Sequence, residues 1–425
     1  MYTFGLMLNN DRHSKESVTL TFQSKRIASM HDTLGQRSNR MGRRTMAAIP
    51  LRLVLASRNL FHDRIRFVAT TVGVVFSVIL VTVQLGLYVS CQRMITAMID
   101  RAQADLWIVP MNARSFEDNG MLEGQERFQA LATPGVTDAI PLLAGFSAWR
   151  RPDGGTTAVI IVGISNDRPG LRPWNFVAGS LDDLTIPDGV IIDRSYFKRL
   201  GITGSGQHAE ISNQRVRVVA LTDLIRSFTT APFVFTTLER ARHFLGVDSN
   251  SSTYYLVQVS PSADLYRVRA SLGGNLSDAE VLTPKEFHDR SLVQWFYSTG
   301  AGAALIAGAI LGIIVGTVIV AQTLYSSAKD HLNEFATMRA MGSSAFYIHQ
   351  VILCQAFLSA VIGFFIAAIL AWIIVQATAT AAVPVIMTPI LTLSLFILTV
   401  AMCALSAVAA IIKVTRIDPV LVFNR

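Results

Sequence analysis

Two stretches of the chain are each long and apolar enough to cross a lipid bilayer as a single helix. A crossing takes about 20 mostly apolar residues, because the hydrocarbon core is about 30 Å thick and a helix rises about 1.5 Å per residue. The first stretch covers residues 67–91, between Arg66 and Arg93. The second covers residues 295–324, inside a run without charged residues. We predict a transmembrane helix at each place.

A third apolar run is too long for one span. No Asp, Glu, Lys or Arg occurs from Ala340 to Ile412. Pro384 and Pro389 interrupt the run, and proline breaks a helix because it lacks the backbone N–H and clashes with the preceding turn. We therefore predict two further spans, at residues 348–377 and 390–412, joined by a short outer loop at residues 378–389.

The polar segment between the first two spans, residues 92–294, has the pattern of a folded domain. About 200 residues can bury a core of their own. Four runs within it are rich in the residues that favour strands: Leu106–Val109, Thr157–Val162, Val216–Leu221 and Tyr254–Val259. The predicted fold class is an α-helical membrane protein with four transmembrane helices and a large extracytoplasmic mixed α/β domain inserted between helices 1 and 2.

Composition and charge indicate how the chain lies in the membrane. Only 16% of the residues are charged, where a soluble domain has about 25%. On one side of the membrane the short segments that flank the spans are basic, with Arg52, Arg58, Arg64, Arg66, Lys329, Arg339, Lys413, Arg416 and Arg425. The arginines of the long segment 92–294 do not contradict this, because the charge rule does not govern loops of that length. Because basic flanks stay cytoplasmic, we expect a multi-pass protein of the cytoplasmic (inner) membrane with both termini inside. This charge pattern suits a lipid bilayer, and we expect no nucleic-acid partner.

The segments before the first span and after the last span are predicted to be short and cytoplasmic. Residues 1–45 are polar and basic, which is typical of a disordered tail or of a misassigned start before Met46. Residues 46–66 have the pattern of an amphipathic helix at the cytoplasmic interface. Residues 413–425 form a cytoplasmic tail.

The sequence offers no motif for catalysis or for nucleotide binding. No lysine follows a glycine, which excludes a GxxxxGK[ST] phosphate loop, and neither HExxH nor GxSxG occurs. The three cysteines, Cys91, Cys354 and Cys403, all lie in apolar stretches, which excludes a disulfide framework and a cysteine-based zinc site. We expect no catalytic residue, no metal and no cofactor bound by this chain.

A stripe of small residues lies along the second span. Its members are spaced four apart, so they share one face of a helix: Gly300, Ala304, Gly308, Gly312 and Gly316. Small residues let two helix backbones approach closely. The stripe suits equally well packing against another span of the same chain and a dimer contact with a second copy.

The polar segment between the second and third spans, residues 325–347, resembles the coupling segment of the MacB/FtsX-type ABC transporter permeases. The matching residues are Tyr325, Lys329, Glu334, Phe335, Arg339, Ala340, Met341 and Gly342. Ala336 and Met338 stand where that family usually has glycine and leucine. Residues 56–66 and 416–420 also resemble the family's lead-in and closing motifs. Details at 321–325 and 329–332 resemble the DevC-like branch.

The resemblance implies that this chain is a transporter subunit that catalyses no reaction itself. Such permeases work as dimers with separate cytoplasmic ABC ATPase subunits, which bind and hydrolyse the ATP. Tyr325, Lys329, Glu334, Phe335, Arg339 and Gly342 are then the residues expected to couple to the ATPase. Motion passes through the spans to the outer domain.

The DevC-like branch implies export of a lipid or amphiphilic substrate, with a periplasmic adaptor and an outer-membrane duct as further partners. Two alternatives within the family are an FtsX-like regulator of cell-wall hydrolases and a lipoprotein-release permease.

Overall fold

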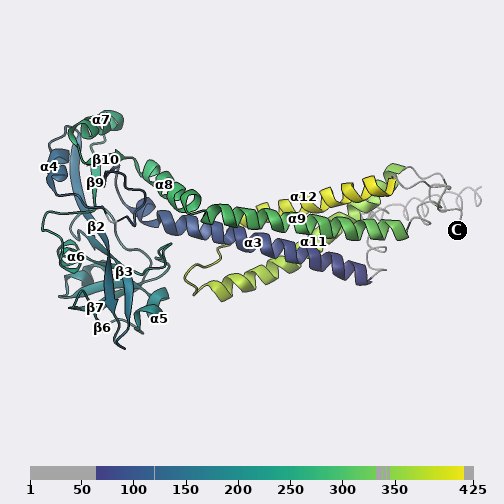
Figure 1. The fold of residues 1–425 in the computed structure, drawn as a ribbon, viewed down its shortest axis with the longest axis horizontal. Coiled ribbons are helices and arrows are strands. Elements are labelled where there is room, and N and C mark those ends of the chain that lie inside the picture. Colours follow the sequence, from purple (N-terminus) through teal and green to yellow (C-terminus); the bar gives the residue numbers. More distant parts are fainter. Residues whose placement is uncertain (1–63, 119, 332–336, 338–340, 342–344, 416–425) are drawn as a thin grey trace, which may run out of the picture. The chain divides into compact units, whose positions relative to one another are not determined.

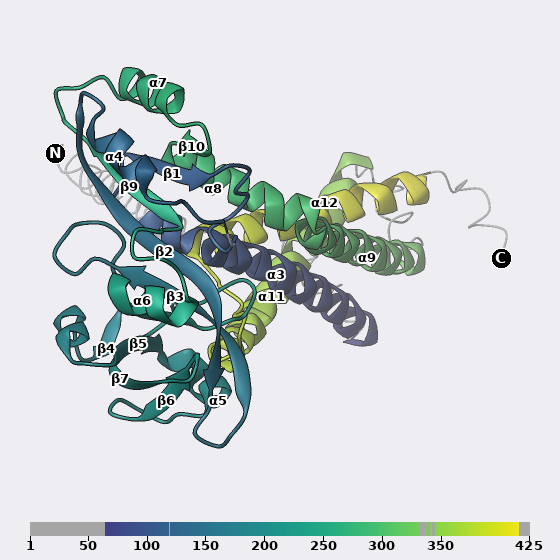
Figure 2. The same cartoon turned by 60° about the vertical axis from the view of Figure 1, so that its left-hand side comes forward.

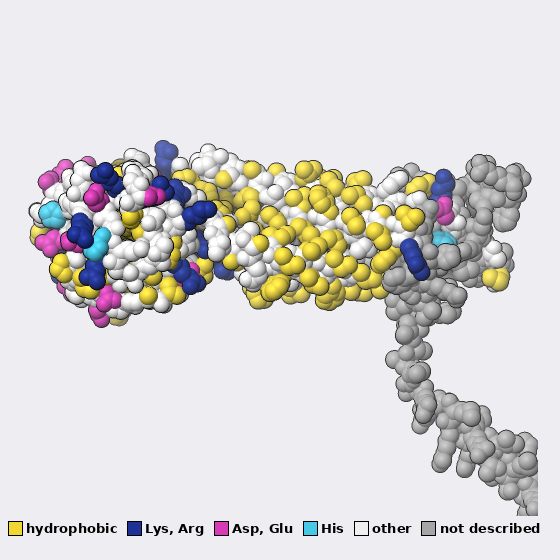
Figure 3. All heavy atoms as spheres, turned by 90° about the horizontal axis from the view of Figure 1, so that it is seen from below, with side chains coloured by type: hydrophobic (Ala, Val, Ile, Leu, Met, Phe, Trp, Pro, Cys, Tyr) yellow, Lys and Arg dark blue, Asp and Glu magenta, His cyan; other side chains and the backbone are white. Residues whose placement is uncertain are grey.

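Four long apolar helices form the membrane part of the protein. The computed structural model describes residues 64–118, 120–331, 337, 341 and 345–415. The helices that are long and apolar enough to span a membrane are α3 (Arg64–Arg101), α9 (Ala301–Asp330), α11 (Ala345–Thr378) and α12 (Pro389–Thr415). They lie side by side in both ribbon views (Figures 1 and 2). Figure 3 shows hydrophobic side chains covering one face of them. The four predicted spans are confirmed.

These four helices, here called the bundle, pack through small side chains and a few buried hydroxyls. Ala360, Cys403 and Ala407 are completely buried between helices. Ser77 Oγ on α3 donates a hydrogen bond to the carbonyl oxygen of Gly312 on α9 at 2.6 Å. Such bonds matter in hydrocarbon, where no water satisfies polar groups. Through them and the small residues, α3 packs closely against α9.

The segment between α3 and α9 folds around a mixed ten-stranded sheet and is here called the head (residues 102–292). The strand order is β10-β1-β9-β2-β3-β8-β5-β7-β4, and β6 pairs with β2 and β7. The strands are β1 (Leu106–Pro110), β2 (Val136–Arg150), β3 (Thr156–Ile164), β4 (Phe176–Ala178), β5 (Gly189–Asp193), β6 (His208–Ile211), β7 (Gln214–Thr222), β8 (Phe233–Thr237), β9 (Tyr254–Val259) and β10 (Ala279–Leu282). The four strands predicted from the sequence are β1, β3, β7 and β9, so the mixed α/β domain between the first two spans is confirmed.

The long strand β2 joins the two halves of this sheet. Its residues 136–142 pair with β9, and its residues 143–150 pair with β3. One half therefore consists of β10, β1, β9 and the start of β2, and the other begins with the end of β2 and β3. Residues 145–150 of β2 alternate between more and less exposed positions, which reflects a covered and an open face at this end of the strand.

Short helices cover the sheet. They are α4 (Gln125–Leu131), α5 (Phe197–Leu200), α6 (Leu238–Leu245), α7 (Leu265–Asn275) and α8 (Pro284–Leu292), with short helical turns at η1 (Leu181–Thr185) and η2 (Arg194–Tyr196). Ala130 of α4 and Leu272 of α7 pack on the first half of the sheet. Ala241 and Phe244 of α6 pack on the second half.

Two helical connections join the head to the bundle. The helix α3 continues past Cys91 without a break, and its last turns bury Met98 and Ile99 in the head core. The chain returns through α8, whose Thr283 and Glu286 form a capping box, and then through the π-helical turn η3 (Val293–Ser298). Gly300, with φ of 75°, separates this turn from α9.

Candidate functional site

The predicted coupling residues fall mostly outside the described part of the chain. Glu334, Phe335, Arg339 and Gly342 belong to positions that the structure does not describe. Tyr325 and Lys329 lie in the last turns of α9, which continues to Asp330. Tyr325 packs against the bundle core, and Lys329 is exposed. Their role in coupling stays a prediction.

Three residues of the small-residue stripe face α3. A Cβ added to Gly308 would lie 2.6 Å from Gln84 Nε2, and one added to Gly312 would lie 3.1 Å from Val81 Cγ2. A Cβ added to Gly316 would overlap Ser77 Oγ. These glycines therefore allow the close approach of two spans of the same chain.

The other two members of the stripe behave differently. Gly300 caps α9, and no neighbour lies within 4 Å of the position that a Cβ would take there. Ala304 is exposed on the surface of α9. The stripe thus divides into a packed part and an open part.

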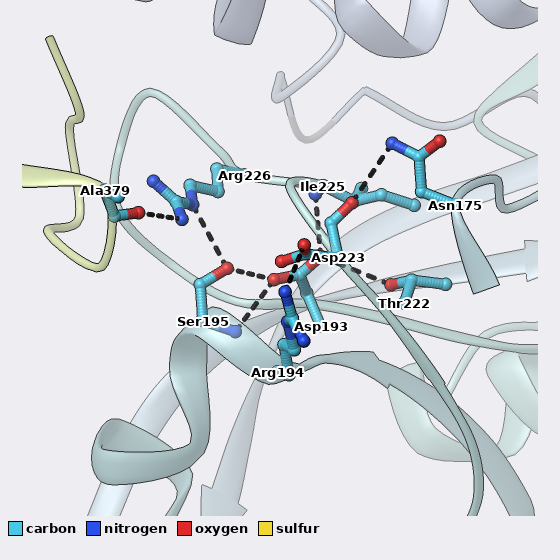
Figure 4. Close-up of polar contacts among 9 residues, drawn as sticks. All are labelled: Asn175, Asp193, Arg194, Ser195, Thr222, Asp223, Ile225, Arg226 and Ala379. Carbon is cyan, nitrogen blue, oxygen red and sulfur yellow. Dashed lines mark hydrogen bonds and ion pairs between the residues drawn. The ribbon is translucent and has the colours of Figure 1, made fainter. Parts of the chain in front are cut away.

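A second contact between head and bundle runs through Arg226, which lies in the loop between β7 and β8 (residues 223–232, here called the β7–β8 loop). Its side chain is buried, with 5% exposure for the residue. Nη2 donates to the carbonyl oxygen of Ala379 at 2.7 Å, and Nη1 donates to that of Ala381 at 2.9 Å. Both acceptors belong to the loop between α11 and α12 (residues 379–388, here called the α11–α12 loop). Figure 4 shows the guanidinium between the two segments.

Asp193, at the end of β5, holds the β7–β8 loop in place. Its Oδ2 accepts a hydrogen bond from the backbone N of Ile225 at 2.7 Å, and its Oδ1 accepts bonds from the backbone N and the hydroxyl of Ser195. Ser195 Oγ in turn accepts a bond from Arg226 Nε at 3.1 Å. Burial raises the pKa of Asp193 above its ordinary value, against the effect of these hydrogen bonds. The contacts run without a gap from the sheet to the guanidinium (Figure 4).

A second carboxylate, that of the partly buried Glu117, supports the same loop. Ser227 Oγ donates to Glu117 Oε1 at 2.7 Å, and the backbone N of Ser227 donates to Tyr196 Oη at 3.1 Å. Burial raises the pKa of Glu117, and it raises the pKa of Tyr196 to about 12. Glu117 Oε2 is buried and has no hydrogen-bond partner among the described residues.

Apolar side chains complete the junction. The rings of Phe228 and Trp295 lie 5.0 Å apart between centroids, and those of Tyr88 and Phe296 are stacked at 4.6 Å. Val383 of the α11–α12 loop packs against the same cluster. Side chains from α3, η3, the β7–β8 loop and the α11–α12 loop therefore share one cluster.

The chemistry of this junction is that of a structural link. In the described ranges, no group of three or more His, Cys, Asp or Glu side chains is placed to hold a metal ion. The buried carboxylates each accept hydrogen bonds from neighbouring donors of the head. The arrangement links head and bundle through hydrogen bonds and apolar contacts.

Sequence reasoning did not find this junction. The acceptors for Arg226 are backbone carbonyls, which any residue type supplies, and they lie more than 150 positions away along the chain. The one available signal is the segment at residues 222–230, Thr-Asp-Leu-Ile-Arg-Ser-Phe-Thr-Thr. It comes at the end of a predicted strand, and its single arginine lies between apolar residues.

Two protein families match this chain. The family described as MacB-like periplasmic core domain matches residues 67–274. The family described as FtsX-like permease C-terminal matches residues 306–419. The two matches follow one another without overlap and together include most of the chain. No curated protein matches it.

Three solved structures are similar to part of the chain. The periplasmic region of MacB from Actinobacillus actinomycetemcomitans is 12% identical, with a TM-score of 0.33, over 45% of this chain and 94% of that chain. The extracellular domain of the noncanonic ABC-type transporter YknZ from Gram-positive bacteria is 14% identical, with a TM-score of 0.31, over 42% of this chain and 99% of that one. A permease-protein domain from Porphyromonas gingivalis is 15% identical, with a TM-score of 0.30, over 44% of this chain and 91% of that domain.

Proposed function

We propose a mechanical role for this chain, which carries the two domains of the MacB- and FtsX-type ABC-transporter permeases. As such a permease it is a multi-pass membrane subunit with an extracytoplasmic head and without a catalytic domain. Its role is to pass the work of a separate cytoplasmic ATPase through the bundle to the head.

One observation carries this proposal: all four bundle helices are tied to the head. The helix α3 enters the head core directly, and α9 is joined to it through α8 and η3. The remaining two helices, α11 and α12, are joined by the loop whose carbonyls bind Arg226. A displacement of any span therefore acts on the head.

The strength of the Arg226 link suits this role. A hydrogen bond to a charged group contributes about 1.5–3 kcal/mol net. Arg226 makes two such bonds to the α11–α12 loop, and its guanidinium is buried, so losing the acceptors would leave a charge without partners. Breaking the link would therefore be costly, which favours movement of the α11–α12 loop together with the head.

The cytoplasmic part of the proposal rests on the coupling segment and on the basic flanks. In it, Tyr325, Lys329, Glu334, Phe335, Arg339 and Gly342 contact the ATPase, which alone uses ATP. Both termini lie in the cytoplasm, and two copies of the chain form a homodimer. Buried aromatic and arginine side chains often dominate such interfaces, which favours Phe335 and Arg339 as anchors.

We further propose that the transporter is an exporter of the DevC-like kind, acting on a lipid or amphiphilic substrate. Residues 321–325 and 329–332 support that branch. A periplasmic adaptor and an outer-membrane duct would complete the complex. A regulator of cell-wall hydrolases and a lipoprotein-release permease use the same mechanics, and proteins that co-purify with the chain in detergent separate these three.

The test replaces Arg226 by alanine and, in a second variant, by lysine. Each variant is co-purified with the ATPase subunit, and ATP hydrolysis and transport are measured in the same vesicles. Arg215→Ala, an exposed arginine of the head, is the matched control. We expect Arg226→Ala to assemble with the ATPase and to hydrolyse ATP, but to lose most of the transport. Full transport by Arg226→Ala would contradict the proposal.

A further inference from the structure

A cavity of about 320 Å³ lies in the head between α4 and α6. Its walls come from the first half of the sheet and from the helices and loops beside it. Arg127 and Phe128 come from α4, Arg168 from the segment after β3, Arg242 from α6, and Tyr255 from β9. Ligand pockets have volumes of about 300–1,000 Å³, so this one suits a headgroup rather than a whole lipid. None of its lining residues belongs to the junction with the bundle.

In two of the three arginines, Arg127 and Arg242, the terminal Nη atoms are available to a ligand. Arg127 Nε donates to the carbonyl oxygen of Ala139 at 3.0 Å, and Arg242 Nε donates to that of Ser251 at 3.2 Å. These bonds fix each guanidinium through Nε. Across the described residues, neither arginine has an ion pair, and no hydrogen bond engages its Nη atoms. A guanidinium held in this way presents a fork of donors that matches a carboxylate, sulfate or phosphate.

The two guanidinium groups also act on each other. Burial lowers the pKa of Arg242. The nearby Tyr255 and Glu239 raise it, and the charge of Arg127 makes the smallest contribution, which lowers it. Two like charges that share a partly buried cavity repel each other. An anion between them would relieve this repulsion.

Arg168 differs from the other two because its charge is already balanced. Its Nη1 lies 3.1 Å from Asp138 Oδ1, and its Nε lies 3.9 Å from the carboxylate of Asp167. Asp167 also lines the cavity, but its side chain is 81% exposed to solvent. Arg127 and Arg242 are therefore the arginines of the cavity that form no ion pair among the described residues.

An apolar surface adjoins these charges. Phe128 lines the cavity and is 66% exposed, and Leu131, one turn further along α4, is 39% exposed. Leu238 of α6 lines the cavity from the opposite side. An exposed aromatic ring beside two free guanidinium groups suits a ligand that combines an anionic group with a hydrocarbon part.

We propose that this cavity binds the anionic headgroup of an amphiphile, with Arg127 and Arg242 on the anion and Phe128 against the first part of the hydrocarbon chain. The binding itself is independent of the proposed function. The assignment of the ligand as the transported substrate rests on that function. A bilayer lipid and a transported amphiphile share the same headgroup chemistry.

The test is calorimetric titration of the purified full chain, in an uncharged detergent and without the ATPase. The probes are hexyl phosphate, hexylammonium and inorganic phosphate, all of which stay monomeric in water. We expect hexyl phosphate to bind and hexylammonium not to bind. Inorganic phosphate should bind more weakly than hexyl phosphate, because it gains nothing from Phe128. Equal affinity for the two phosphates would overturn the amphiphile assignment.

Variants separate the two parts of the site. Arg127→Gln combined with Arg242→Gln should lower the affinity for hexyl phosphate by at least about tenfold, as expected for the loss of charge-assisted bonds. Arg215→Gln, outside the cavity, should not change it. The double variant also loses two internal hydrogen bonds, so Phe128→Ala provides a milder test. It should lower the affinity for hexyl phosphate and leave the affinity for inorganic phosphate unchanged. Unaltered binding of hexyl phosphate by Phe128→Ala would refute the proposed site.

Transport assays then distinguish a lipid from a substrate. If the amphiphile is the cargo, Phe128→Ala should raise the substrate concentration needed for half-maximal transport and leave the maximal rate unchanged. Binding without any effect on transport would assign the cavity to a bilayer lipid and overturn the substrate assignment. That result would leave the mechanical role tested by Arg226 untouched.

Discussion

His288 Nδ1 lies 2.7 Å from Asp100 Oδ1, and this contact joins α8 to the last turn of α3 at the base of the head. Asp100 Oδ2 also accepts a hydrogen bond from Thr96 Oγ1 at 2.7 Å. The carboxylate of Asp100 therefore contacts Thr96 of α3 and His288 of α8. The two connections between head and bundle are therefore joined to each other. Arg290 extends the same contact region by pairing with Glu280 at 2.7 Å.

The pair formed by His288 and Asp100 should align the helices while adding little stability. The two side chains are 27% and 50% exposed, and an exposed ion pair contributes under about 1 kcal/mol. A double-mutant cycle with His288→Ala and Asp100→Ala, measured by thermal unfolding of the full chain in detergent, should give a coupling energy in that range. The more exposed pair of Arg267 and Asp264 is the control and should give less. A coupling energy well above about 2 kcal/mol would show that the pair holds the fold together.

The packed part of the glycine stripe should tolerate no larger residue. A side chain at Gly316 would overlap Ser77 Oγ and lie 2.8 Å from Met402 Sδ. Overpacking of this kind costs about 1–3 kcal/mol. Gly316→Leu should therefore lower the melting temperature of the chain in detergent.

Ala304→Leu serves as the control on the same stripe, and it also decides between the two interpretations of the stripe. Ala304 is exposed, so the larger side chain should change stability by less than about 0.5 kcal/mol. Size-exclusion chromatography with light scattering reports the oligomeric state. Loss of a dimer in Ala304→Leu alone would assign the open part of the stripe to a contact between copies.

Phe335→Ala should uncouple the chain from its ATPase and leave the fold intact. An aromatic anchor of an interface contributes about 2 kcal/mol or more, which corresponds to a loss of affinity of about 30-fold. Glu334→Gln should act in the same direction. ATPase stimulation and co-purification are the measurements, and Thr337→Ala in the same segment is the control. Normal stimulation in both variants would remove these residues from the coupling site.

Replacing Glu117 by glutamine should stabilise the protein at neutral pH. Burial raises the pKa of Glu117 above its ordinary 4.5, so the folded state binds its proton more tightly than the unfolded state. The stability from this group is fully present below about pH 4.5 and is lost as the pH rises through the raised pKa. Glu117→Gln removes that loss and keeps an oxygen for the hydrogen bond from Ser227.

Thermal unfolding of the full chain between about pH 4 and pH 8 measures this effect. The melting temperature of Glu117→Gln should exceed that of the unaltered protein at the upper end of the range. The difference should shrink toward the lower end. Glu123→Gln, an exposed control, should follow the unaltered protein at every pH. If Glu117→Gln were less stable at neutral pH, the carboxylate would be stabilised by groups other than those described here.

The sequence was sufficient to predict the membrane helices and several strands, because both leave a local signature. Uncharged runs identify spans, and runs of aromatic, aliphatic and β-branched residues such as Tyr254–Val259 identify buried strands. The continuation of α3 past Cys91 lies outside the predicted span, which ends before Arg93. Met94, Ile95, Met98 and Ile99 carry the helical spacing that could have revealed it.

The junction and the stripe show where local patterns stop being informative. The bond from Arg226 to Ala379 joins two distant segments through a backbone oxygen, and no spacing rule predicts such a partner. The glycine spacing correctly indicated a close helix approach but did not identify α3 as the neighbour. Tertiary structure alone supplies that information, and it also separates Gly300, which caps the start of α9, from Gly316, which packs inside that helix.

The proposed relay of motion from the ATPase to the head is tested most directly by a distance measurement between the two heads of the proposed homodimer. A spin label at Gln214→Cys, an exposed head position, is introduced after Cys91, Cys354 and Cys403 have been replaced by alanine. Double electron–electron resonance is recorded on the complex with its ATPase in lipid nanodiscs, without nucleotide and after trapping with ATP and vanadate. We predict that trapping shifts the distribution of distances between the two labels, and that Arg226→Ala reduces this shift. Identical distributions in the two nucleotide states would contradict a mechanical role for this chain.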